Sequence, residues 1–117
     1  MRALANRVLV TAFYLGAGLV GVLSLAPSGA LPEVPVDDKA EHALAYAALG
    51  LLGAASSHGI ARLILGLAAY GTALELLQAF SPGRSPDPTD ALADIIGACL
   101  GAAIGIALRR VVLIAAK

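Results

Sequence analysis

The sequence is poor in charged residues, aromatic residues and cysteine. Only 14% of its 117 residues are charged and 59% are hydrophobic, whereas a typical soluble domain is about 25% charged and about 45–50% apolar. A mean hydropathy of +0.85 is too high for a soluble monomer. Eight basic and eight acidic residues give a net charge of zero, so the basic excess expected of a nucleic-acid-binding protein is missing. The single cysteine, Cys99, excludes an internal disulfide.

Four apolar segments are long enough to predict membrane helices. They cover about residues 5–26, 40–57, 60–80 and 88–108. Since a membrane helix takes ~20 residues, four helices leave no room for a soluble domain. Proline-rich and glycine-containing stretches predict a long loop after the first helix and tight turns after the second and third. We therefore expect a single all-α domain over residues 1–117, an integral membrane four-helix bundle.

The first segment also has the basic start of a signal peptide. Its apolar run is longer than a usual signal core, so we expect a retained helix. Four helices place both termini and the turn near Gly59 on one side, which holds six of the eight basic residues: Arg2, Arg7, Arg62, Arg109, Arg110 and Lys117. The positive-inside rule then puts the N and C termini in the cytoplasm. All eight acidic residues lie toward the other side, so we expect the protein's chemistry to face outward.

Polar side chains occur inside these apolar segments, where they are costly and usually functional. At a rise of ~1.5 Å per residue, His42, Glu75 and Asp94 all lie in the outer third of a ~30 Å apolar core. Asp38, His42 and Tyr46 step by four residues along one helix face. The common depth predicts that these side chains meet in one cluster.

Two helices are expected to begin at the outer surface with recognisable caps. Asp38 and Glu41 have the spacing of a capping box. Asp87 precedes Pro88, which suits the first helical position. Arg84, in the loop before the last helix, is expected to reach back over the polar cluster.

The cluster permits three interpretations. It is a structural network in which His42 and Arg84 neutralise the acids, or a binding or catalytic site for a polar head group, or a site for protons or a metal ion. The head-group site would use the anion-binding helix N-termini, with a bridging divalent cation to offset the acids. The metal site would use His42, Glu75, Asp90 and Asp94, because carboxylates with one imidazole can hold a divalent ion.

Glycines recur every four residues in the last helix, at Gly97, Gly101 and Gly105. Such a stripe lets two helices approach closely in lipid. The stripe predicts either packing within the bundle or a face for homo-oligomerisation.

The polar residues form three blocks of fixed spacing. The blocks are Asp38-Lys39-x-x-His42-x-x-x-Tyr46, then Glu75-x-x-Gln78-x-Phe80-x-Pro82-Gly83-Arg84, then Asp87-x-x-Asp90-x-x-x-Asp94-x-x-Gly97. In order and spacing they resemble the VanZ-like family over about residues 37–105. The family usually has Asn where this chain has Asp94, and an aromatic residue where it has Ala43.

The resemblance implies a multi-pass protein of the bacterial plasma membrane, in a family whose namesake is linked to resistance to the glycopeptide teicoplanin. Carried over by position, the site residues are Asp38, Lys39, His42, Tyr46, Glu75, Gln78, Arg84, Asp87, Asp90 and Asp94. We expect the chain to bind a membrane lipid or lipid-linked cell-wall precursor at the outer leaflet, and to modify it if the chain is an enzyme. The resemblance leaves open whether the chain is an enzyme.

Four of the site residues have an expected role in that function. His42 would act as acid or base, Arg84 would contact an anion, and Glu75 and Asp94 would orient groups or hold a cation. Asp94 is costly when ionised at its depth, so it is expected either to be protonated, as the Asn of the family suggests, or to pair with His42 or Arg84. The alternative functions are a non-enzymatic structural or assembly protein and a small ion or proton carrier.

Overall fold

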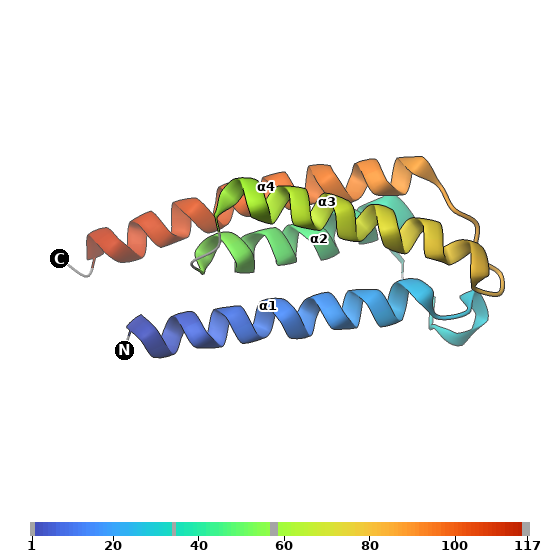
Figure 1. Ribbon diagram of the computed structural model, residues 1–117, viewed down its shortest axis with the longest axis horizontal. Coiled ribbons are helices and arrows are strands. Elements are labelled where there is room, and N and C mark those ends of the chain that lie inside the picture. The colour runs from blue at the N-terminus through green and yellow to red at the C-terminus, as the bar shows by residue number, and fades with distance from the viewer. Residues whose placement is uncertain (1, 34, 57–58, 116–117) are drawn as a thin grey trace.

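The computed structural model describes residues 2–33, 35–56 and 59–115, and these residues form an elongated helical bundle (Figure 1). Its long helices are α1 (Arg2–Leu25), α2 (Asp38–Ala55), α3 (Ile60–Leu77) and α4 (Pro88–Ala115). Short 3-10 helices, η1 (Ser28–Ala30) and η2 (Gln78–Phe80), follow α1 and α3. The described residues include no strand, so the all-α class is confirmed. The turn predicted at 57–59 lies largely outside the described residues.

Three of the helices are long and apolar enough to cross a membrane: Arg2–Leu25, Ile60–Phe80 and Pro88–Val112. The remaining helix, α2, has 18 residues but carries Asp38, Lys39 and Glu41 in its first turn. These charges set α2 apart from the other three. Membrane-helix character is therefore shown for three helices, and a membrane-spanning role for α2 stays a prediction.

The ends of the helices are arranged as the sequence predicts. Figure 1 shows the start of α1 and the end of α4 at one end of the molecule, and the loops before α2 and before α4 at the other. The acidic helix starts of α2 and α4 thus share one end of the bundle. The side of the membrane that this end faces stays a prediction.

Helices α2 and α4 approach closely because glycines remove side chains from their interface. A Cβ atom on Gly97 would lie 2.2 Å from the Ala43 carbonyl oxygen, and one on Gly101 would lie 1.9 Å from that of Ala47. Gly105 is buried in the same row. The stripe therefore packs inside the chain, as one of its two interpretations expected, and it does not offer an exposed face to a second copy.

Helix α1 is joined to the rest of the bundle less tightly. Phe13 is its buried residue, and it packs with Tyr46 and Leu49 of α2 in the core. Large apolar side chains elsewhere on α1, such as Val8 and Leu15, are exposed, as expected of a helix that faces lipid.

Candidate functional site

The first turn of α2 differs by one residue from the expectation. Asp37, not Asp38, is the N-cap, because its carboxylate accepts a hydrogen bond from Lys39 N at 3.2 Å. Two consecutive aspartates can each fill this role, and the spacing to Glu41 favoured the second. Asp38 is instead the first helical residue, and its side chain is exposed.

The first turn of α4 is capped as predicted. Asp87 Oδ1 accepts hydrogen bonds from Thr89 N at 3.0 Å and from Thr89 Oγ1 at 2.7 Å. Pro88 takes the first helical position, where its missing N–H costs nothing.

Lys39 joins the two helix starts. Its Nζ donates to Asp87 Oδ2 at 2.8 Å and also pairs with Asp90 Oδ1. The hydrogen bond from the Lys39 ammonium, helped by those from Thr89, lowers the pKa of the Asp87 carboxyl to about 2. The first turns of α2 and α4 are therefore tied together at this end of the bundle.

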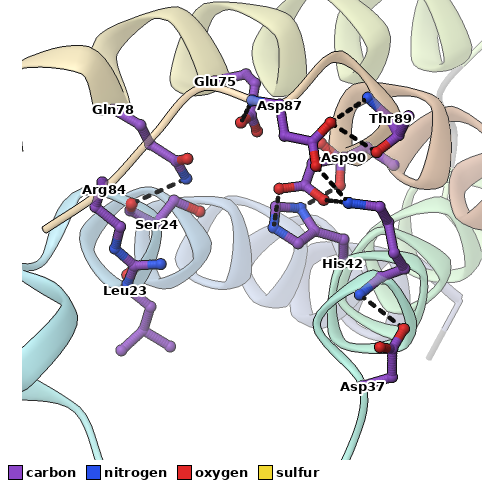
Figure 2. A network of polar contacts seen from close by, with 12 residues as sticks. Leu23, Ser24, Asp37, His42, Glu75, Gln78, Arg84, Asp87, Thr89 and Asp90 are labelled. Carbon is purple, nitrogen blue, oxygen red and sulfur yellow. Dashed lines mark hydrogen bonds and ion pairs between the residues drawn. The ribbon is translucent and has the colours of Figure 1, made fainter.

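His42 lies between two buried carboxylates of α4. Its Nδ1 is 2.8 Å from Asp94 Oδ1, and its Nε2 is 3.6 Å from Asp90 Oδ2. Asp94 is 2% exposed and Asp90 is 5% exposed. Figure 2 shows His42 directed at Asp90. A hydrogen bond to Asp94 fixes the orientation of the imidazole ring, and the second nitrogen is left facing Asp90.

Helix α3 packs against the His42–Asp94 pair at Gly71. A Cβ atom on Gly71 would lie 2.7 Å from Asp94 Oδ2 and 3.3 Å from the Tyr46 hydroxyl. Tyr46 is itself 2% exposed. Three helices therefore meet at Asp94, and the lack of a side chain at Gly71 makes room for its carboxyl group.

The two predicted residues at the end of α3 are buried and contact different partners. Glu75 Oε1 accepts a hydrogen bond from Asp87 N at 2.6 Å. The Glu75 carboxyl group therefore lies next to the start of α4. Gln78 Nε2 donates to the Ser24 carbonyl oxygen of α1 at 3.1 Å. Glu75 thus belongs to the acidic cluster, whereas Gln78 holds α1.

Arg84 does not lie over the acids as expected. Its Nε donates to the Ala26 carbonyl oxygen at 2.9 Å, and its Nη2 donates to that of Leu23 at 3.2 Å. Figure 2 shows Arg84 beside Ser24 and Leu23, apart from the His42 group. A cation suits the carbonyl end of a helix. The expectation that Arg84 neutralises the acids is wrong, because the end of α1, far away in the sequence, takes its hydrogen bonds.

A partly open cavity of about 660 Å³ lies between α1, α2 and the loop residues 31–33 and 36. Its lining combines apolar residues with five of the predicted site residues: Asp38, His42, Tyr46, Gln78 and Arg84. The other five predicted residues, Lys39, Glu75, Asp87, Asp90 and Asp94, are not among its lining residues. The sequence pattern did not single out Ser24 or Glu33, which also line the cavity, because their positions depend on how α1 and the following loop fold back.

The structure changes the set of residues suited to a metal ion. Asp38, His42 and Asp90 each offer a ligand atom, and these atoms lie within 4.8 Å of one another. Of the four residues expected from the sequence, Glu75 accepts a hydrogen bond from Asp87 N and Asp94 pairs with His42 Nδ1. Among the described residues, every fully buried side-chain nitrogen or oxygen has a hydrogen-bond partner.

Comparison with known proteins identifies one family. A family model described as VanZ/LLP1 matches residues 10–110, a range that contains every site residue named above. No curated protein and no solved structure matches the chain.

Proposed function

This chain belongs to the VanZ/LLP1 family, and we propose that it binds the head group of a lipid or lipid-linked envelope precursor in the cavity between α1 and α2. The protein would lie in the bacterial plasma membrane with this cavity toward the outer leaflet. The proposed orientation follows from the distribution of basic residues along the chain.

The cavity is the observation that carries this proposal. Apolar residues from α1, the loop and α2, among them Val20, Leu31 and Ala45, share its lining with His42 and Arg84. Ligand sites in proteins are typically clefts of ~300–1,000 Å³ with mostly apolar walls and a few polar groups that orient the ligand. A lipid has both parts, since its chain suits the apolar wall and its head group suits the polar residues.

The charges around the cavity limit the head groups that it can accept. Glu33, Asp38 and Glu41 line it together with Arg84 and His42. Because carboxylates outnumber the permanently charged cation, a bare anion is disfavoured. The cavity suits a zwitterionic head group, or an anionic one that arrives with a cation.

A bulky substitution in the cavity wall tests the proposal. Ala45 lines the cavity, whereas Ala48, three residues further along α2, is exposed. Ala45→Phe would fill the cavity, and Ala48→Phe would add the same ring outside it. We expect native mass spectrometry of protein purified in mild detergent to show bound lipid for the wild type and for Ala48→Phe, and much less for Ala45→Phe. Wild-type protein without lipid, or equal lipid in both variants, would contradict the proposal.

A second candidate is a non-enzymatic structural or assembly protein. The pairing of every fully buried polar side-chain atom among the described residues favours it, because a satisfied polar network also fixes the arrangement of a bundle. The same lipid measurement separates the two candidates. A cavity that retains no lipid in the wild type would favour the structural role.

A further inference from the structure

We propose a binding site for a divalent transition-metal ion at Asp38, His42 and Asp90, beside the cavity. Their ligand atoms, one imidazole nitrogen and two carboxylate oxygens, lie within 4.8 Å of one another. Metal–ligand bonds to nitrogen and oxygen are roughly 2.0–2.2 Å long. Two ligand atoms of one ion therefore lie at most ~4.4 Å apart. The three atoms lie near this spacing, and the exposed Asp38 side chain can adjust to it.

The orientation of His42 supports this site. Nδ1 faces the buried Asp94 carboxyl group at 2.8 Å, which leaves Nε2 for another partner. A histidine that binds a metal through one nitrogen usually donates the N–H of the other to a carboxylate or carbonyl group. The His42–Asp94 pair has this geometry, with Nδ1 as the donor in the tautomer that leaves Nε2 free to bind a metal.

Asp90 is the buried carboxylate of the proposed site. Its side chain is 7% exposed. Among the described residues, Lys39 Nζ donates a hydrogen bond to Oδ1 of this carboxylate. Oδ2 lies 3.6 Å from His42 Nε2, too far for a hydrogen bond. Two potential ligand atoms on buried or half-buried side chains thus face each other without a hydrogen bond between them.

The balance of charge also favours a cation. Five carboxyl groups gather at the starts of α2 and α4 around Lys39 and the imidazole: Asp38, Glu75, Asp87, Asp90 and Asp94. Arg84 makes its hydrogen bonds with α1 instead. The positive charge of Lys39 disfavours a cation nearby. Asp87, whose Oδ2 lies 2.8 Å from Lys39 Nζ, offsets part of that positive charge. A divalent ion on the other oxygen of Asp90 would offset much of the remaining negative charge.

The ligand types indicate the class of metal. Carboxylates suit Mg²⁺ and Mn²⁺, whereas imidazole suits Zn²⁺ and other transition metals. A site with two carboxylates and one imidazole therefore suits Mn²⁺ or Zn²⁺. Three protein ligands leave coordination positions open toward the cavity, where an oxygen of a head group could bind. The metal site itself does not depend on the proposed lipid binding.

Titration of the full chain with Mn²⁺ tests this site. The protein is purified in a non-ionic detergent, freed of metal with a chelator and titrated with MnCl₂, and free Mn²⁺ is measured by electron paramagnetic resonance. We expect saturable binding of one Mn²⁺ per chain, displaced by Zn²⁺. Pulsed measurements should show coupling of the bound Mn²⁺ to the ¹⁴N of an imidazole. Absence of saturable binding, or of the nitrogen coupling, would overturn the proposal.

A pair of matched variants separates ligation from general attraction. Asp38→Asn removes a proposed ligand, and Glu41→Gln removes the same charge from the same cavity three residues away. Both side chains are exposed, so both variants should fold. Loss of a group that only orients a ligand typically weakens metal binding 10–100-fold, so we expect Asp38→Asn to weaken Mn²⁺ binding at least about 10-fold. Glu41→Gln should stay within about twofold of the wild type, and equal weakening in both variants would overturn the proposal. The titration contains no added lipid, so its failure and failure of the lipid measurement can be told apart.

Discussion

The glycine stripe of α4 offers a direct test of the packing that positions the site. In Gly101→Ala, the new Cβ atom would lie 1.9 Å from the Ala47 carbonyl oxygen, 2.6 Å from its carbonyl carbon and 2.7 Å from its Cα. All three neighbours are backbone atoms of α2. No side-chain rotation can relieve the overlap, so the two helices must move apart.

The distances around the added Cβ atom determine how much Gly101→Ala should destabilise the protein. Cβ atoms in proteins essentially never come closer than 3.0 Å to such a neighbour, so the gap must widen by at least 1.1 Å, the difference from 1.9 Å. Overpacking of this kind typically costs ~1–3 kcal/mol of the free energy of unfolding, occasionally more. We expect the upper part of that range or beyond, because the contact is backbone against backbone. The shift also moves Asp94, two turns earlier on α4, away from His42.

Gly66→Ala is the matched control. Gly66 lies in the middle of α3, and a Cβ atom there would have nothing within 4 Å. Alanine is favoured over glycine inside a helix by roughly 0.5–1 kcal/mol, so this variant should be as stable as the wild type or slightly more stable. Unfolding of both variants by a denaturing detergent in mixed micelles, followed by circular dichroism, measures the difference. Equal stability of Gly101→Ala and the wild type would refute the close α2–α4 packing.

Three further predictions concern the polar cluster. Asp94→Asn should keep the melting temperature at pH 7, because an amide oxygen can accept from His42 Nδ1 as the carboxyl group does. A loss of about 3–5 kcal/mol, typical of a broken buried ion pair, would show instead that the pair is ionised. Gly71→Ala should lower the melting temperature, since its Cβ atom would lie 2.7 Å from Asp94 Oδ2, and an unchanged value would contradict that contact. Hydrogen bonds from Lys39 and Thr89 lower the pKa of Asp87 from 3.8 to about 2, so the stability that these contacts add is present above about pH 4 and is lost as the pH falls toward 2. Melting temperatures measured over that range should therefore depend less on pH in Asp87→Asn than in the wild type, and identical slopes would contradict these contacts of the Asp87 carboxylate.

Local patterns in the sequence predicted most of the helices and part of the cluster. Apolar runs located the helices because a membrane helix must satisfy its own backbone hydrogen bonds along an apolar stretch. Spacing within helices placed Asp38, His42 and Tyr46 on one face, and all three line the cavity. The pairing of His42 with Asp94 followed from their similar depth.

Contacts set by the path of the chain could not be predicted in the same way. The direction of Arg84 depends on where α1 ends in space, and the sequence around Arg84 carries no sign of that. The choice of Asp37 as N-cap depends on one residue of helix register, which propensities rarely decide. The cavity itself depends on where residues 31–33 and 36 lie relative to α1 and α2.

The way each helix is held suggests which part of the cavity wall can open. The glycine stripe of α4 packs directly against the backbone of α2, so these helices cannot separate without losing contacts along much of their length. Helix α1 is instead held by hydrogen bonds to its backbone carbonyl oxygens from the side chains of Tyr70, Gln78, Ser81 and Arg84, and Phe13 is its buried residue. Side-chain hydrogen bonds contribute only ~0.5–1.5 kcal/mol each and can be exchanged one at a time. A lipid chain that enters the cavity is therefore expected to displace α1, while the pair of α2 and α4 keeps His42 and its carboxylates in place.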